Sequence, residues 1–445
     1  MGDTHIQIDK PPLPTPLLNS TQNQANHQPE SLDRDIDLHR ALQRLETFLT
    51  FLGFNQSTVS SFVLSWTVFT LVGVVLPVSI LELSQCSGCE KYQIKDFELE
   101  IVASQACLAA VSLICLSHNL RKYGIRKFLF VDRCSGYSAH LTKAYIQQIK
   151  NSIRLLVLSS LPCFILKFVR EVIRICNVQH ESWWLSAAIL FGLTVSWIYV
   201  STISLSASIL FHIICNLQVI HFADYAKLLE RESDVLVLIE EHILLRYHLS
   251  KISHRFRIFL LLQFTVVTTS QCMSLFRTTG YRGLITAVNG GDFAVSSVVQ
   301  VAGIILSLHA ATRISHRALA IASLASRWHA MVTCTSSDSS HSPPRVSSSS
   351  GNLEVANPQK LLNINYSESD LESLDYISMP TNTQLESYMV SYQKRQSFVL
   401  YLQNNPGGIT IFGWTVDRAL VNTIFFIQLT LVTFVLGKTL VFTSK

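Results

Sequence analysis

Three histidines near the ends of different apolar segments could provide metal chemistry. They are His118, His212 and His309. Three imidazoles at one membrane depth could bind zinc and activate a water molecule, as in an intramembrane metallohydrolase. None of them belongs to an H-x-x-x-H or H-E-x-x-H pair, and the sequence has no Walker motif, no GxGxxG and no Ser-His-Asp context. We therefore expect no metal, no cofactor and no enzymatic activity.

Two cysteines separated by two residues, Cys86 and Cys89, are the second chemical candidate. In an oxidising compartment they could form a disulfide with each other, or with Cys176 or Cys272. No thioredoxin-like βαβ pattern surrounds the pair, so redox catalysis is disfavoured. Most of the ten cysteines lie in apolar runs, where they behave as small apolar side chains.

The last apolar run carries a weakly polar face. At about 100° per residue, this face groups the predicted pore-lining residues Asn422, Thr423, Phe426, Thr430, Thr433 and Gly437, and Gln428 points the other way. Such a face can line water in a channel, or it can be a small-residue surface for helix packing. Asp417 and Arg418 precede it and could form a charged pore mouth. Alternatively they anchor the helix at the membrane interface, with Asp417 favoured by the helix dipole.

A second polar group lies at the other membrane surface. The third apolar run contains Lys167, Arg170, Glu171 and Arg174, and the second begins near Glu98 and Glu100. Ion pairs between helices are the default explanation, because unpaired charge within a span is costly. Cationic or amide groups left over from such pairs could orient a small organic ligand. The candidate pocket residues are Gln105, Lys167, Arg170, Glu171 and Gln300.

The composition requires these groups to be held by membrane helices. The chain has 445 residues, of which 49% are hydrophobic and 15% charged, which is typical of a polytopic membrane protein. Its net charge of +5 is modest, and no nucleic-acid partner is expected. A bilayer core about 30 Å thick requires about 20 apolar helical residues. Seven runs qualify: Phe62–Leu81, Ile101–Ser117, Leu155–Ile175, Trp183–Cys215, Ile258–Leu275, Phe293–Leu308 and Ala419–Leu436.

The distribution of basic residues predicts the orientation of these spans. Lysines and arginines concentrate in the segments after spans two, four and six, while the opposite loops carry few. The positive-inside rule therefore places the N-terminus in the cytoplasm and the C-terminus outside. The three glycosylation sequons, at Asn19, Asn55 and Asn365, all fall on the predicted cytoplasmic side. We expect a multi-pass protein of the plasma membrane rather than of an internal membrane.

Four regions follow from this reading: a disordered cytoplasmic tail (1–37), spans one to six with cytoplasmic helical extensions (38–333), a Ser-rich disordered loop (334–380) and a cytoplasmic helix with span seven (381–445). Span four is too long for one crossing, so we expect it to continue into the cytoplasm. The apolar stripe Ile314, Ala318, Ile321, Ala325 and Trp328 predicts that span six does the same. Such stripes either pack into one bundle or lie on the membrane surface. The break at Asn404–Gly408 should separate the last cytoplasmic helix from span seven.

The C-terminal signature "GGITIFGWTVDRALVNTIFFIQLTLVTFVLGKT", Gly407–Thr439, resembles the plant gustatory-receptor-like family, a domain of unknown function related to insect odorant and gustatory receptors. The resemblance extends from about Leu38 to the C-terminus. It implies an all-α, seven-helix subunit whose cytoplasmic extensions form an anchor bundle at the centre of a homotetramer. It also implies that four copies of span seven line a cation pore, with Asp417 ringing the inner mouth, and that an outer pocket admits a small organic ligand.

The predicted function is therefore a homotetrameric, ligand-gated cation channel, whose partners are the lipid bilayer, inorganic cations and a small organic ligand. The alternative is a membrane receptor or scaffold without a pore that signals through its cytoplasmic helices and Ser-rich loop. The intramembrane zinc hydrolase is the third hypothesis.

Overall fold

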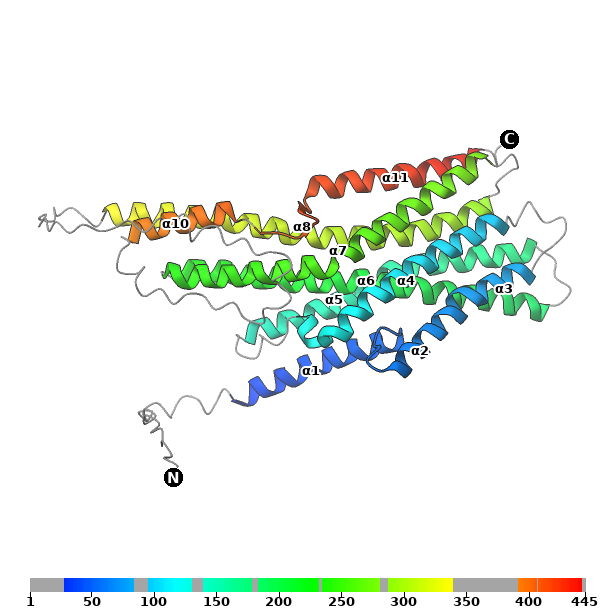
Figure 1. The fold of residues 1–445 in the computed structure, drawn as a ribbon, viewed down its shortest axis with the longest axis horizontal. Helices are drawn as coiled ribbons and strands as arrows, with labels where there is room; N and C mark the ends of the chain where they lie inside the picture. The colour runs from blue at the N-terminus through cyan, green and yellow to red at the C-terminus, as the bar shows by residue number, and fades with distance from the viewer. Residues whose placement is uncertain are drawn as a thin grey trace, which may run out of the picture.

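The computed structural model describes residues 28–83, 95–129, 139–177, 183–231, 234–280, 287–338, 391–405 and 407–441. These residues are almost entirely helical (Figure 1). The helices are α1 (Gln28–Phe51), α2 (Val59–Val68), the π-helix η1 (Phe69–Val75), α3 (Leu76–Leu83), α4 (Lys95–Phe128), α5 (Ala139–Asn177), α6 (Trp183–Arg231), α7 (Val235–Gly280), α8 (Ala287–Asp338), α10 (Ser391–Asn404) and α11 (Arg418–Val441). Strands β1 (Thr410–Ile411) and β2 (Trp414–Thr415) form a small antiparallel hairpin.

Seven of the described helical segments are long and apolar enough to cross a bilayer, and they match the seven predicted runs. The protein is thus an integral, multi-pass membrane protein. The continuous lengths of α6, α7 and α8 are 49, 46 and 52 residues. At about 1.5 Å per residue each helix is about 70 to 80 Å long, more than twice the bilayer core of about 30 Å. Helices α6 and α8 are thus long enough to continue past the bilayer, as expected for spans four and six, and the cytoplasmic location of their extensions stays a prediction.

The extended ends of these helices pack together with α10. The predicted stripe on α8 is buried, with Ile314, Ala318, Ile321 and Ala325 each at most 3% exposed. Next to it, the rings of Trp328 and of Phe398 in α10 lie 6.3 Å apart, edge to face. The stripe is therefore covered by a helix of the same chain, and α10 lies along the end of α8 in Figure 1.

The predicted break before span seven is present, and two glycines explain its shape. Gly407 and Gly408 have φ values of +70° and +139°, a region that side chains with a Cβ rarely adopt. The chain leaves α10 there and forms the β1–β2 hairpin, which is flanked by the fully buried Ile409 and Val416. The Thr410 amide donates to Ser253 Oγ of α7 at 3.1 Å. This hairpin redirects the chain so that α11 starts a new span.

The boundary predicted for the N-terminal tail is wrong. Helix α1 begins at Gln28, within the segment 1–37 that was expected to be disordered. Its leucines Leu38, Leu42, Leu45 and Leu49 recur every three or four residues, and all are buried in contacts that include α5. The first ten residues of α1 are mostly polar, so their helical state was not apparent from composition. Helix α8 also runs to Asp338, past the expected start of the Ser-rich loop at 334. The rest of that loop lies outside the described residues.

Candidate functional site: a buried ion cluster and an exposed helix face

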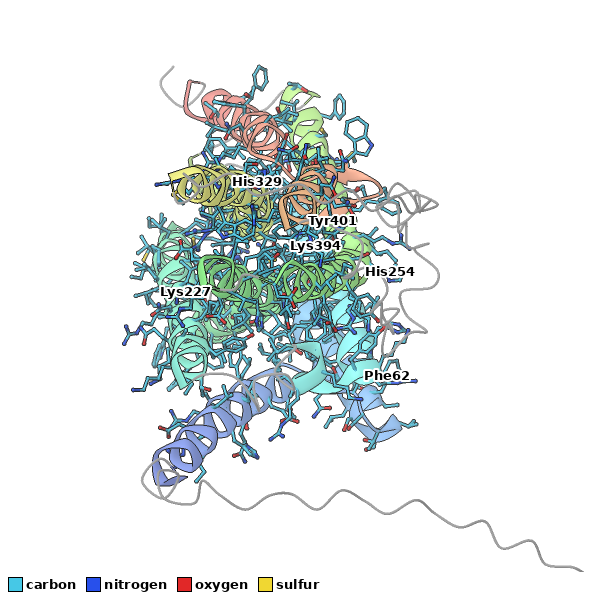
Figure 2. All side chains as sticks on the ribbon, turned by 90° about the vertical axis from the view of Figure 1, so that its left-hand side faces the viewer. Phe62, Lys227, His254, His329, Lys394 and Tyr401 are labelled. Carbon is cyan, nitrogen blue, oxygen red and sulfur yellow. The ribbon has the colours of Figure 1, made fainter. Side chains whose placement is uncertain are left out.

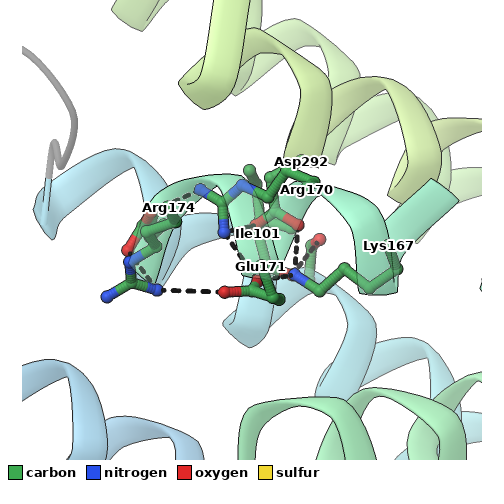
Figure 3. Close-up of polar contacts among 8 residues, drawn as sticks. Ile101, Lys167, Arg170, Glu171, Arg174 and Asp292 are labelled. Atoms are coloured by element: carbon green, nitrogen blue, oxygen red, sulfur yellow. Dashed lines mark hydrogen bonds and ion pairs between the residues drawn. The ribbon is translucent and has the colours of Figure 1, made fainter. Parts of the chain in front are cut away.

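Six charged side chains form a buried cluster between helices of the bundle (Figure 3). Helix α5 supplies four of them at positions i, i+3, i+4 and i+7, which share one helix face. Helices α4 and α8 each add one carboxylate. The members are Glu98, Lys167, Arg170, Glu171, Arg174 and Asp292, and each is at most 6% exposed. With three cations and three carboxylates, the cluster is formally neutral.

Arg170 lies at the centre of the cluster. Its guanidinium contacts Glu98 of α4 at 2.5 Å and Glu171 at 2.6 Å. Lys167 bridges Glu171, at 2.8 Å, and Asp292 of α8. Arg174 lies 3.5 Å from both Glu98 and Glu171. Every buried charge therefore has an opposite charge within contact, and α4, α5 and α8 are joined by the same network.

The ion pairs predicted between helices are confirmed. The cationic groups proposed for a ligand, Lys167 and Arg170, already have carboxylate partners, as does Arg277, which contacts Glu100 at 3.5 Å. Asp292 was not identified from the sequence. The sequence does contain a signal for it, because Asp292 follows two glycines and stands at the start of an apolar run. A carboxylate at such a position requires a cation nearby when it is buried.

The amide candidates lie deeper in the bundle. Gln300 donates to Ser104 Oγ at 3.4 Å, which again joins α8 to α4. Gln105 is 7% exposed, and its side-chain nitrogen has no hydrogen-bond partner among the described residues. A ligand for these amides and for the ion cluster stays a prediction.

The polar face predicted on span seven is uncovered in the single chain. Asn422, Thr423, Phe426, Thr430 and Thr433 are exposed, and Gly437 is partly exposed. On the opposite side, Gln428 is 1% exposed and donates to Thr268 Oγ1 of α7 at 2.8 Å. Of the most apolar part of α11, 11% is buried, the smallest share among the seven spans, compared with 78% for α6. Helix α11 thus lies on the outside of the bundle (Figure 1), and the exposure of these residues leaves its weakly polar face open in the single chain.

Asp417 lies immediately before α11. Its Oδ1 accepts a hydrogen bond from the Leu420 amide at 2.8 Å, which caps the first turn of the helix. Asp417 and Arg418 are both exposed. The carboxylate is therefore a helix cap that also presents negative charge at the start of the span.

The remaining candidates are not assembled into sites. Within the residues that the structure describes, no three His, Cys, Asp or Glu side chains are placed to hold a metal ion, so His118, His212 and His309 do not converge. Cys176 and Cys272 are free thiols. Cys86 and Cys89 lie outside the described residues.

The fold resembles that of a solved receptor structure. The structure is similar to that of the insect olfactory receptor OR5 from Machilis hrabei, with a TM-score of 0.50 and 13% sequence identity over 90% of this chain and 98% of that chain. The resemblance to insect odorant receptors is thus confirmed at the level of the fold. None of the curated proteins matches the sequence. A family model matches residues 40–427, and the chain therefore belongs to the family described as "Protein of unknown function (DUF3537)".

Proposed function

We propose that the protein is the subunit of a homotetrameric, ligand-gated cation channel in the plasma membrane, with α11 lining the pore. The observation that carries this proposal is the open, weakly polar face of α11, next to an opposite face that packs against α7 and α8. The receptor-like fold supports it, because the same resemblance implies a pore formed by four copies of this helix.

The chemistry of that face suits cations. Asn422, Thr423, Thr430 and Thr433 carry side-chain oxygens that can replace part of the water around an ion. Phe426 interrupts these positions and would narrow the pore. At the start of the helix, four Asp417 carboxylates would attract cations to the mouth. The hydrogen bond that each Asp417 accepts from the Leu420 amide would also fix where each pore helix begins.

The other parts of the molecule take matching roles. We place the α10 end and the N-terminus in the cytoplasm, where the packed ends of α6, α7, α8 and α10 would form the anchor bundle between subunits. A small organic ligand would enter from the opposite side and contact Gln105 and Gln300 near the ion cluster. Because Asp292 and Gln300 lie on α8, and α8 contacts α11, a ligand there could change the position of the pore helix.

The first measurement is the mass of the detergent-purified particle by light scattering, corrected for bound detergent. Four chains of 50.0 kDa are expected. A tetramer then justifies a test of the pore in reconstituted bilayers with Thr430→Cys and, as its matched control, Phe425→Cys. Both positions are exposed on α11, but Phe425 lies about 60° outside the edge of the proposed pore face, measured from Asn422.

A charged thiol reagent should block cation current through Thr430→Cys and leave Phe425→Cys and the unmodified protein conducting. Equal effects on both variants would contradict the assignment of the pore face. A monomeric particle, or a tetramer that passes no cations with or without candidate ligands, would instead favour the receptor or scaffold without a pore.

A further inference from the structure

A band of basic side chains surrounds the point where α4 ends beside α7. Helix α4 contributes Arg121, Lys122, Arg126 and Lys127, and α7 contributes Lys251, Arg255 and Arg257. The acidic residues of these helices lie elsewhere: α4 has none after Glu100, and α7 has none after Glu241. We call these seven residues the basic band. Its sign is uniform over about two turns of each helix.

Contacts between helices hold the band together. The Arg255 guanidinium lies 3.6 Å from the ring centre of Tyr123, and the Asn119 amide donates to the Arg255 carbonyl at 3.2 Å. The backbone of α4 bends at Gly124, where φ is +67°, and its last turn packs Phe128 against Phe256 at 5.6 Å between ring centres. The bend therefore places Arg126 and Lys127 beside α7.

Four accessible members of the band, Arg121, Arg126, Lys127 and Lys251, have no acidic partner among the residues that the structure describes. Arg121, Arg126 and Lys127 are exposed, and Lys251 is partly exposed over the ring of Tyr247. Among the described residues, no carboxylate lies within salt-bridge distance of these four cations. Four neighbouring cations without a carboxylate partner in the described part of the chain favour an external anion.

Three features place the basic band at a membrane surface. The apolar run of α4 ends just before it, the apolar run of α7 begins just after it at Ile258, and α11 starts its span at Arg418. Figure 1 shows the end of α4 and the start of α11 at nearly the same position along the long axis. The hairpin contacts the band where Arg257 lies over the ring of Phe412 at 5.4 Å. It also exposes Trp414, as is common at the lipid headgroup level.

We propose that the basic band binds the headgroups of anionic phospholipids in the leaflet at this level. The phosphate and carboxylate of such a lipid can accept charge-assisted hydrogen bonds from Arg121, Arg126 and Lys127, while its acyl chains follow the apolar part of α4. This binding surface is independent of the pore, so it holds for a channel and for a receptor without one.

The test uses the full chain reconstituted in vesicles that contain trace spin-labelled phosphatidylserine or phosphatidylcholine. Electron spin resonance then gives the relative association of the two lipids with the protein. The test variant combines Arg121→Gln, Arg126→Gln and Lys127→Gln. The control combines Lys227→Gln, Arg231→Gln and Arg327→Gln, which remove the same charge from exposed positions at the α10 end.

The wild-type protein and the control should associate with phosphatidylserine several-fold more than with phosphatidylcholine, and salt should reduce the difference. The test variant should bring the ratio close to one, provided that it elutes as the same particle with the same helix content as the wild type. Equal association of both lipids with the wild type, or an unchanged ratio in the folded test variant, would overturn the proposal.

Discussion

At the scale of single residues, charge neutrality explains why six ionisable groups can lie inside the bundle. A buried charge without a partner costs several kcal/mol, and a pair recovers this cost when its geometry is good. Arg170 and Glu171 each contact two or more opposite charges, so removal of any member leaves its partners uncompensated. Figure 3 shows how Lys167 bridges the carboxylates of α5 and α8. The cluster therefore specifies which helices are neighbours.

We expect Asp292→Asn to destabilise the protein by about 3 to 5 kcal/mol, because it leaves a net positive charge buried at Lys167 and Arg170. The double variant Lys167→Met with Asp292→Asn leaves two cations and two carboxylates, and it should recover much of this loss. Thermal unfolding in detergent measures both. If the double variant loses as much stability as the Lys167→Met and Asp292→Asn single variants lose together, charge balance is not the cause.

At the scale of helices, α10 and α11 differ in how much of their surface is buried against the rest of the chain. Helix α10 buries Phe398 and Leu402 completely against α8 and α7, whereas α11 leaves most of its surface open. His242 of α7 adds a polar contact at 3.3 Å to the Tyr401 hydroxyl of α10. Figure 2 shows Tyr401 and Lys394 on α10 beside His329 near the end of α8. The β1–β2 hairpin thus separates α10, which packs against α7 and α8, from α11, whose surface is mostly exposed.

Truncation of Phe398 tests whether α10 is held by packing. Phe398→Ala should cost about 3 to 5 kcal/mol, because it leaves a cavity next to Trp328. Leu400→Ala on the exposed side of α10 is the matched control and should change stability by less than about 0.5 kcal/mol. Limited proteolysis of α10, with thermal unfolding, gives the readout. If α10 resists proteolysis equally in Phe398→Ala and Leu400→Ala, the packing of Phe398 is not what holds this helix.

At the scale of the whole molecule, the two ends of the bundle have opposite character. One end holds α10 and the extended ends of α6, α7 and α8, and the other holds the start of α4 and the end of α11 (Figure 1). The fold is shared with an insect olfactory receptor over most of the chain, although 13% of the aligned residues are identical. At this level of identity the likeness concerns the fold and carries no role for particular side chains.

The orientation that the basic residues predict for these ends can be tested directly. A peptide tag after Lys445 should be reached by an antibody on intact cells, whereas a tag at Met1 should require permeabilisation. The control is a tag at each end in permeabilised cells, where both must stain. The reverse pattern would place α10 outside the cell and would contradict the proposed cytoplasmic anchor bundle.

The sequence by itself determined the features that depend on local patterns. The seven spans, the buried stripe from Ile314 to Ala325 and the break at Asn404–Gly408 were all predictable, because hydrophobic periodicity and glycine placement act over a few turns of one helix. The polar face of α11 was predictable for the same reason. The start of α1 was not, because its first turns are polar and its leucines are buried only by contact with a distant helix.

The tertiary structure alone decided the contacts between helices. Lys167 and Asp292 are 125 positions apart, and Gln428 and Thr268 are 160 apart. A sequence shows that each of these groups needs a partner, but several groups of suitable charge or polarity were available at similar depth. The choice among them follows from which helices pack side by side, because burial makes an unpaired charge or amide costly and only an adjacent helix can supply the partner.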